Sequence, residues 1–265
     1  MTGAAIDFPR FTGLAGGPGS LATTLAPQRK MPRNREMPMD AVNDVSFDTP
    51  HLWILGAGAS VQALPTGDKN GQPLPVMKNL VEIVGLTQLL DDHSIQYRDR
   101  NFEDVYDQLA RKDEYQGICR ESEDRIVSYF SRLQLPEEPC LYDYLVWSLR
   151  SKDVIATFNW DPFLWQACVR AAQFFKPPQI VFLHGNVALG YCVKDMVKGS
   201  VGTPCDKCGA TFAASRLLFP VSQKNYAADP QIENEWKDVK TALKSAFIVT
   251  VFGYSAPRTD VEAIQ

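Results

Sequence analysis

Long hydrophobic runs are missing from this chain. No stretch of its 265 residues approaches the roughly 18 consecutive apolar residues of a membrane-spanning helix. The amino-terminal residues also lack the apolar core and small-residue cleavage site of a secretory signal. These absences predict a cytoplasmic protein that works without a membrane.

Blocks of basic residues and a disulfide framework are also missing. The chain has 27 Lys and Arg against 31 Asp and Glu, a formal net charge of −4. Nucleic acid is therefore not expected as the main partner, because a phosphate backbone attracts basic surfaces. Six cysteines are too few to form a disulfide framework in a chain of this length. In a reducing compartment, closely spaced cysteines indicate a metal site instead.

Residues 1–48 have little apolar periodicity. Gly and Pro recur there, and four basic residues cluster near two prolines: Arg29, Lys30, Pro32, Arg33, Arg35 and Pro38. This composition predicts a disordered tail. A basic arm for nucleic acid is the alternative, but Glu36 and Asp40 interrupt it. Met31, Met37 and Met39 within this stretch are alternative starts of translation.

The ordered part is expected to begin at His51. Residues 52–55 read as a buried strand, and the segment Gly56-Ala57-Gly58-Ala59-Ser60 follows at once. A strand, a glycine turn and a helix start are typical of a dinucleotide phosphate loop. Val61 occupies the place of the usual third glycine, so a tight turn without a ligand is the alternative. The Pro- and Gly-rich loop at 65–75 is long enough to act as a lid.

Between residues 76 and 150 the apolar pattern is helical. Apolar residues recur along one face of each expected helix, and these stripes predict a helical layer or insert. The side chains of the stripes are expected to form core, and no chemical role is assigned to them. One stripe consists of Phe102, Val105, Tyr106 and Leu109; another of Ile126, Val127, Phe130 and Leu133; a third runs from Leu141 to Arg150.

Polar side chains follow two further predicted strands. The buried run Val154–Ala156 leads into Thr157, Asn159 and Asp161, and the run at 179–183, after a helix at 162–174, ends at His184. Open α/β sheets bind ligands at the carboxyl ends of their strands, so these side chains are expected to meet there. The alternatives are an ordinary Asn/Asp turn and a structural histidine.

The segment 190–212 is predicted to form a small cysteine module. Cys205 and Cys208 are two thiols at zinc-knuckle spacing, followed by a glycine that permits the turn. Cys192 and Asp195 can complete a tetrahedral site, whose role would be structural. Three free thiols are the alternative.

The last predicted elements are an amphipathic helix at 229–245 and a buried strand at 247–252. The strand ends in Gly253-Tyr254-Ser255, so glycine and hydroxyl groups again stand at a carboxyl edge. Residues 259–262 look like a helix start close to Gln265, which suggests a truncated product.

The order of these motifs resembles the sirtuin family over residues 51 to 262. The segment 157–161 matches the family's T-Q-N-I-D, His184-Gly185 its His-Gly pair, Cys205 and Cys208 its second zinc pair, and 253–255 its G-T-S. The resemblance implies an α/β fold with a Rossmann-like parallel sheet of the sirtuin type, a helical insert and a small zinc-knuckle-like module. Residues 49–265 would form the NAD-binding domain.

Several departures from the family pattern bear on function. No Phe-Arg follows Pro65, the first zinc pair is reduced to Cys192 with Asp195, and 218–221 replace the F-G-E stretch that docks an acetyl-lysine peptide. The helical region and the pattern at 102–104 are more similar to bacterial sirtuin-like proteins of antiphage defence, several of which hydrolyse NAD. This resemblance favours an NAD glycohydrolase that releases nicotinamide and ADP-ribose.

The resemblance also assigns roles to residues. Asn159 and His184 would be catalytic, NAD the substrate and zinc a structural ion held by Cys192, Asp195, Cys205 and Cys208. An NAD-dependent protein deacylase, a non-catalytic NAD-responsive module and a binding domain without nucleotide are the alternatives. A homo-oligomer or a defence effector would be the partner. The residues expected to bind NAD are Gly56, Ala57, Gly58, Ser60, Thr157, Asp161, Gly253, Tyr254 and Ser255.

Overall fold

The computed structural model describes residues 49–221, 226, 229–256 and 260, all within one compact unit. The predicted tail at 1–48 and the predicted helix start at 259–262, apart from Asp260, lie outside the described residues. Within the described part, no helix combines the length and the apolar character needed to cross a bilayer.

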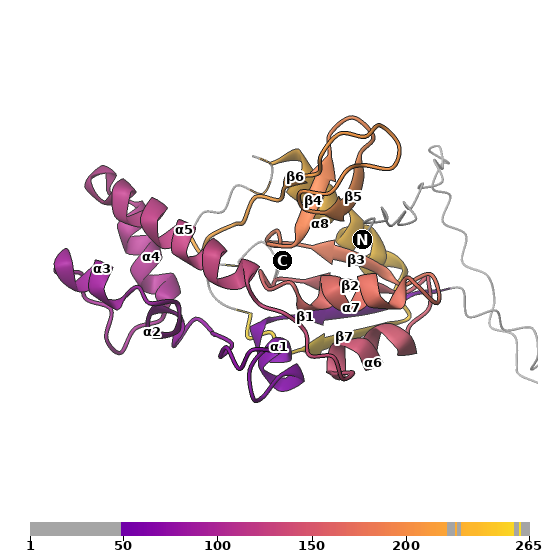
Figure 1. Ribbon diagram of the computed structural model, residues 1–265, viewed down its shortest axis with the longest axis horizontal. Helices are drawn as coiled ribbons and strands as arrows, with labels where there is room; N and C mark the ends of the chain where they lie inside the picture. Colours follow the sequence, from indigo (N-terminus) through magenta and orange to yellow (C-terminus); the bar gives the residue numbers. More distant parts are fainter. Residues whose placement is uncertain (1–48, 222–225, 227–228, 257–259, 261–265) are drawn as a thin grey trace, which may run out of the picture. The chain divides into compact units, whose positions relative to one another are not determined.

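A parallel sheet of four strands forms the centre of the unit (Figure 1). Its order is β3-β2-β1-β7, and each neighbouring pair is parallel. This arrangement confirms the predicted α/β class, and it brings the carboxyl ends of all four strands to one edge. The strands are β1 (His51–Leu55), β2 (Val154–Thr157), β3 (Gln179–Phe182) and β7 (Ile248–Phe252).

Helices cover both faces of the sheet. On one face α8 (Pro230–Ser245) packs Ile232, Trp236 and Val239 against side chains of β1, β2 and β3. The helix begins where Asp229 accepts the backbone N–H groups of Gln231 and Ile232, at 2.8 and 3.3 Å. On the opposite face, a separate hydrophobic cluster packs the sheet against three helices. They are α1 (Ala57–Ala63), α6 (Leu141–Ser148) and α7 (Phe163–Ala171).

Strand β7 differs from its prediction. Its apolar side chains were expected to be buried, yet Val249 is 44% exposed and Val251 56% exposed. The strand lies at the edge of the sheet and pairs only with β1 in the described part of the chain. Periodicity predicts a strand but not its place in the sheet order, so it cannot distinguish an edge strand from a central one.

The helical insert consists of short helices between β1 and β2. All four residues of the first stripe are buried on α4 (Phe102–Ala110), but Val127 of the second stripe is 39% exposed. Val127 directly follows the buried Ile126, and one residue rotates a helix by about 100°. The elements are α2 (Leu80–Val84), α3 (Thr87–Asp92), α4 (Phe102–Ala110), the 3₁₀ turn η2 (Asp113–Tyr115) and α5 (Gln116–Ser131).

The loop at 65–75 is attached to the end of α5. The buried Asp68 carboxylate accepts the N–H groups of Asn70 and Gln72, at 2.8 and 2.9 Å, and that of Gln134 at 3.0 Å. The Tyr129 hydroxyl donates to the Pro73 carbonyl at 2.6 Å. These bonds hold one conformation of the loop, and its action as a lid stays a prediction.

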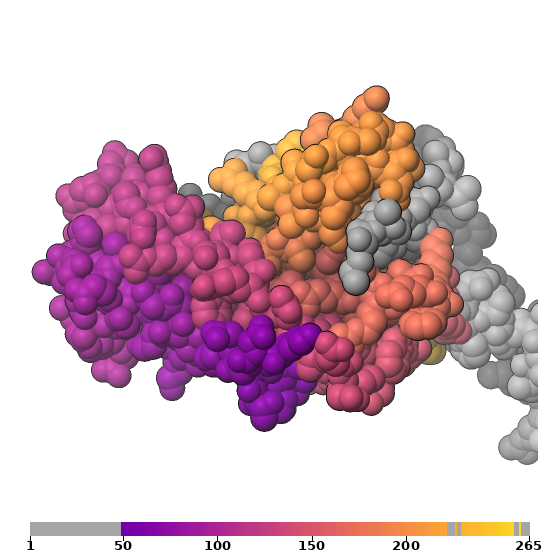
Figure 2. All heavy atoms as spheres, in the orientation of Figure 1, coloured from indigo at the N-terminus to yellow at the C-terminus, as the bar shows by residue number. Residues whose placement is uncertain are grey.

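The cysteine module is a small antiparallel sheet of order β5-β4-β6. In Figure 2 it forms the orange part of the visible surface, distinct from the magenta surface of α4 and α5. The strands are β4 (Leu189–Cys192), β5 (Val197–Ser200) and β6 (Ala213–Ala214).

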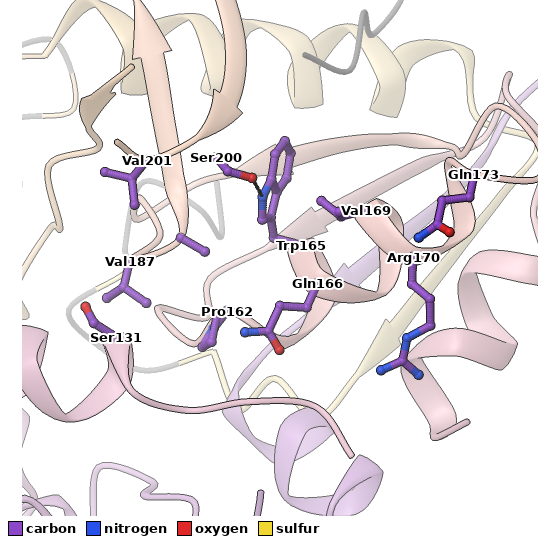
Figure 3. Close-up of a pocket in the computed structure, with 11 residues that line it drawn as sticks. Ser131, Pro162, Trp165, Gln166, Val169, Arg170, Gln173, Val187, Ser200 and Val201 are labelled. Carbon is purple, nitrogen blue, oxygen red and sulfur yellow. Dashed lines mark hydrogen bonds between the residues drawn. The ribbon is translucent and has the colours of Figure 1, made fainter. Parts of the chain in front are cut away.

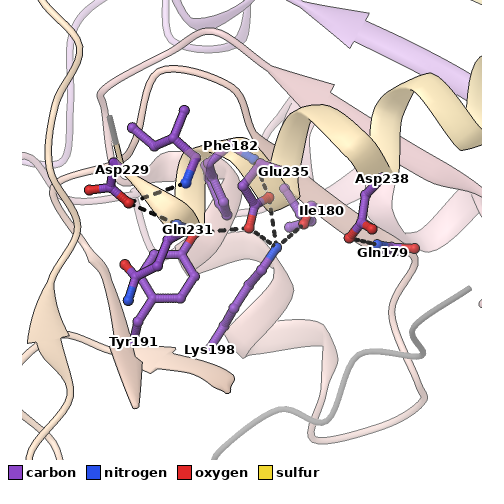
Figure 4. A network of polar contacts seen from close by, with 10 residues as sticks. Gln179, Ile180, Phe182, Tyr191, Lys198, Asp229, Gln231, Glu235 and Asp238 are labelled. Atoms are coloured by element: carbon purple, nitrogen blue, oxygen red, sulfur yellow. Dashed lines mark hydrogen bonds and ion pairs between the residues drawn. The ribbon is translucent and has the colours of Figure 1, made fainter. Parts of the chain in front are cut away.

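A buried ion pair joins this module to the main sheet (Figure 4). The Glu235 carboxylate on α8 accepts from Lys198 Nζ, from the Tyr191 hydroxyl and from the Phe182 N–H, each at 2.8 Å. Because Glu235 is buried, these three donors compensate the cost of removing its charge from water. The contacts connect α8, β3, β4 and β5.

Candidate active site

A cleft of about 680 Å³ lies at the carboxyl edge of the parallel sheet. Each strand contributes the residues that follow it: Gly56 to Gly58 after β1, Phe158 to Asp161 after β2, His184 after β3, and Gly253 to Ser255 after β7. Four segments that are far apart in sequence therefore line one cavity.

The helical insert supplies another wall of this cleft. Pro75 to Lys78, Asn101 and Glu103 line it, together with Leu218 and Pro220 from the segment after β6. The insert thus contributes to the cavity rather than only to the core, which its apolar stripes did not predict.

Asn159 is held by a buried polar network. Its Nδ2 donates to the Gly56 carbonyl at 3.0 Å, to the Ser60 hydroxyl at 2.9 Å and to the Tyr142 hydroxyl at 3.3 Å. Its Oδ1 is buried and has no hydrogen-bond partner among the described residues. A buried acceptor without a donor is costly, so this oxygen is suited to receive a hydroxyl group or water in the cleft.

Asp161 lies in the same network. Its carboxylate accepts from the Ser60 hydroxyl at 2.6 Å and from the Phe163 N–H at 3.3 Å. Burial raises the pKa of Asp161 to about 6, although the Ser60 hydrogen bond opposes the rise. The Asn186 side chain donates to the Asp161 carbonyl at 2.6 Å and fixes the backbone of the turn.

His184 packs between aromatic rings at the end of β3. Its ring centroid lies 4.9 Å from that of Phe158, edge-on, and 6.3 Å from that of Tyr226. Phe158 in turn stacks on Tyr254, with ring centroids 4.2 Å apart and planes at 5°. The backbone carbonyl of His184 accepts the Leu218 N–H at 3.0 Å. Packing and backbone bonds thus restrict the position of the imidazole.

The glycine turn differs from its expected role. The N–H groups of Gly56 and Gly58, predicted to hold a pyrophosphate, donate to the carbonyls of Phe252 and Gly253 at 3.1 and 2.9 Å. A Cβ on Gly56 would lie 2.6 Å from the Gly253 carbonyl oxygen. In this structure the two glycines allow the ends of β1 and β7 to approach, while Ala57 also lines the cleft.

Two of the predicted NAD-binding residues do not line the cleft. Ser60 is buried behind it in the Asn159 network, and the Thr157 hydroxyl accepts the Asn159 N–H at 3.1 Å. Both side chains orient Asn159 rather than face the cavity. The remaining predicted residues, which line it, are Gly56, Ala57, Gly58, Asn159, Asp161, His184, Gly253, Tyr254 and Ser255.

Residue patterns did not identify three further participants. Tyr142 belongs to the third apolar stripe, where a tyrosine is indistinguishable from core. Phe158 and Asp260 have no periodic or spacing signal of their own. The Tyr142 hydroxyl lies 2.7 Å from Ser60 Oγ, and since Ser60 donates to Asp161, Tyr142 is the donor in this contact.

The four predicted zinc ligands come together in the module. Their ligand atoms all lie within 4.8 Å of one another. Cys192 Sγ lies 3.4 Å from Cys208 Sγ, and Asp195 Oδ2 lies 3.5 Å from Cys192 Sγ and 3.4 Å from Cys205 Sγ. Tetrahedral zinc with these donors requires separations of about 3.5 to 3.8 Å. The cluster therefore fits a structural zinc ion.

A second pocket of about 510 Å³ lies along α7 (Figure 3). Several of its polar side chains are already bonded within the protein. Trp165 Nε1 donates to the Ser200 hydroxyl at 3.1 Å, Gln166 bonds to the backbone at Leu133 and Leu135, and Arg170 pairs with Asp143 at 3.2 Å. These bonds leave the pocket few polar groups for a ligand.

The chain was compared with protein families, with single proteins and with solved structures. No family model matches the chain. Methionine–tRNA ligase of Chromobacterium violaceum is 31% identical over 87 residues, which are 33% of this chain and 11% of the ligase. The chain thus spans about a ninth of that relative's length.

Among solved structures, a Sir2 homologue in complex with NAD is 14% identical, with a TM-score of 0.41 over 86% of this chain and 78% of that one. The chain is similar to Sir2 proteins. Sir2 bound to an acetylated peptide is 17% identical, with a TM-score of 0.37 over 86% of this chain and 82% of the Sir2 chain. These Sir2 structures belong to the family that the order of motifs resembles.

Proposed function

We propose that this protein binds NAD in the cleft at the sheet edge and hydrolyses it to nicotinamide and ADP-ribose. The observation that carries the proposal is the single cavity in which the unpartnered Oδ1 of Asn159, the imidazole of His184 and the Asp161 carboxyl meet. An amide acceptor, an imidazole that can accept a proton and a carboxyl group suit the cleavage of a glycosidic bond.

The reaction exchanges the bond between nicotinamide and ribose for a bond to water. Its transition state resembles an oxocarbenium ion, as in glycoside hydrolysis. The bonding electrons leave with nicotinamide, the water oxygen bonds to the ribose carbon, and one water proton is released. Asn159 Oδ1 would accept a hydrogen bond from the attacking water or a ribose hydroxyl. The His184 imidazole would accept the proton.

The other wall residues have supporting roles in this proposal. Asp161, whose pKa of about 6 keeps part of its population protonated near neutral pH, would bind the nicotinamide carboxamide, as the family resemblance implies. Gly253, Tyr254 and Ser255 would contact the adenosine side.

The segment that replaces the family's peptide-docking stretch supports hydrolysis over deacylation. Phe219 packs against Tyr106 of the helical insert, with ring centroids 5.3 Å apart, and against Trp160, at 5.0 Å. Leu218 and Pro220 line the cleft beside it. Aromatic packing therefore occupies this segment, which favours water as the second substrate. A role in antiphage defence, with an oligomer or an effector as partner, extends the proposal by resemblance.

The proposal is tested by incubating the purified protein with NAD and quantifying nicotinamide and ADP-ribose. His184→Ala and Asn159→Ala should each lower the rate by about 10² to 10⁴ while circular dichroism stays unchanged. His93→Ala, at an exposed histidine, is the matched control and should retain full activity. Near-normal turnover in either cleft variant would contradict the mechanism. Consumption of NAD only when an acetyl-lysine peptide is added would indicate the deacylase.

A further inference from the structure

A carboxylate lies directly behind the imidazole of His184. Asp260 Oδ1 is 3.4 Å from His184 Nε2. Asp260 itself is only 1% exposed, and it lines the cleft with His184. A buried carboxylate needs partners that compensate its desolvation, and a histidine that can carry a proton is one.

The carboxylate is held from its other side. The Tyr254 hydroxyl donates to Asp260 Oδ2 at 2.9 Å. The Tyr254 ring is itself stacked face to face on Phe158, which contacts the His184 ring. The residues Phe158, His184, Tyr254 and Asp260 therefore form a closed set in which each member limits the movement of the next.

We propose that Asp260 is a positioning residue for His184. The inference rests on the proposed function, and it adds a carboxylate that orients the imidazole and stabilises its protonated form. When the water oxygen bonds to the ribose carbon and the nicotinamide bond breaks, one water proton passes to the imidazole. The resulting imidazolium then faces the Asp260 carboxylate. A carboxylate beside the imidazole likewise supports the base of hydrolytic triads, where the two groups are hydrogen-bonded.

The titration of His184 reports this contact. Asp260 and Tyr226 face its ring, and the Tyr254 hydroxyl is bonded to Asp260. The carboxylates of Glu103 and Asp104 on α4 line the same cleft and stay in place in every variant. A nearby negative charge favours the protonated form of an imidazole. Replacing Asp260 by a neutral isostere therefore lowers the pKa of His184, while a tyrosine hydroxyl is neutral in this pH range.

Asp260→Asn is the decisive variant in two measurements. In the NAD assay, kcat should fall at least about 10-fold, KM should change little, and the acid limb of the pH profile should move to lower pH. Asp260→Glu should restore part of the rate. Asp124→Asn, at an exposed position on α5, is the matched control and should leave both parameters unchanged.

The second measurement does not require turnover. The chain has three histidines, so the imidazole signals can be followed by NMR during a pH titration and assigned with His51→Gln and His93→Gln. The pKa of His184 should be lower by about one pH unit in Asp260→Asn, and it should not fall in Tyr254→Phe, which leaves the carboxylate in place. Should Asp260→Asn not fold, Asp260→Ser provides the same test, because it also removes the carboxylate.

The two measurements separate the inference from the proposed function. A wild-type protein that releases no nicotinamide would overturn the proposed function, whatever the histidine titration shows. An unchanged His184 titration together with an unchanged pH profile would overturn the role of Asp260, even if the wild type hydrolyses NAD.

Discussion

The hydroxyl of Ser60 donates a 2.6 Å hydrogen bond to the carboxylate of Asp161, across 101 positions of sequence. The bond connects the first turn of α1 to the segment that follows β2. Ser60 is also 2.9 Å from the Asn159 amide nitrogen. A single buried hydroxyl therefore sets the relative positions of two residues in the cleft wall.

The protonation of Asp161 should make stability depend on pH. Its pKa rises from 3.8 to about 6 on folding because the carboxyl is buried. The folded state then binds the proton more tightly than the unfolded state, so its contribution to stability is complete below pH 3.8 and is lost as the pH rises through about 6. The loss amounts to about 3 kcal/mol.

Asp161→Asn tests this dependence, because its side chain stays neutral. The free energy of unfolding of the variant, relative to wild type, should increase as the pH rises from about 4 to about 7. Urea unfolding at several pH values measures it, with Asp124→Asn as the exposed control. A difference that is the same at every pH would show that Asp161 is not protonated near neutral pH.

Gly253→Ala should disrupt the junction of β7 with the glycine turn. Gly253 has φ of +66°, and a Cβ there would lie 2.0 Å from the Ala59 nitrogen. Both the left-handed conformation and the clash oppose a side chain, so we expect a loss of more than about 3 kcal/mol or a failure to fold.

Gly202→Ala is the matched control for this substitution. Gly202 also has a positive φ, +77°, but a Cβ there would meet no atom within 4 Å. It should cost only the conformational strain, about 1 to 2 kcal/mol. Thermal unfolding of both variants compares the two effects, and equal losses would indicate that the close approach at Gly253 is unimportant.

Cys205→Ser should release zinc from the module. The purified wild type should contain about one zinc ion per chain, and the variant much less, with a lower Tm because metal binding contributes to folding. Asp195→Cys should retain the ion, since a thiolate is an equivalent ligand. Lys207→Gln, at an exposed position between the two thiols, should change neither zinc content nor Tm. Wild-type protein without zinc, combined with an unchanged Tm in Cys205→Ser, would contradict the metal site.

Local patterns predicted most of the elements but not their depth in the fold. The strands at 52–55, 154–156 and 179–183 and the helix at 229–245 appear where apolar periodicity placed them. Leu243 on that helix is nevertheless 46% exposed, and Ile248, Val249 and Val251 of β7 are exposed to a similar degree. Burial depends on which elements are neighbours in space, and a one-dimensional pattern carries no such information.

Some residues of the candidate site could be predicted from local patterns, and others only from the structure. Thr157, Asn159, Asp161 and His184 stood out because polar residues follow buried runs, and the zinc ligands because of their spacing. Tyr142 and Asp260 did not, since their roles come from contacts with residues far away in sequence.

The sequence by itself determined an α/β chain with polar groups at the ends of its strands and a four-ligand cysteine module, because strand periodicity and ligand spacing are local properties. Only the tertiary structure decided that the glycines of the first turn pack against Gly253, that the helical insert lines the cleft, and that Asp260 faces His184. These relationships depend on sheet order and side-chain packing, which form only when distant segments meet.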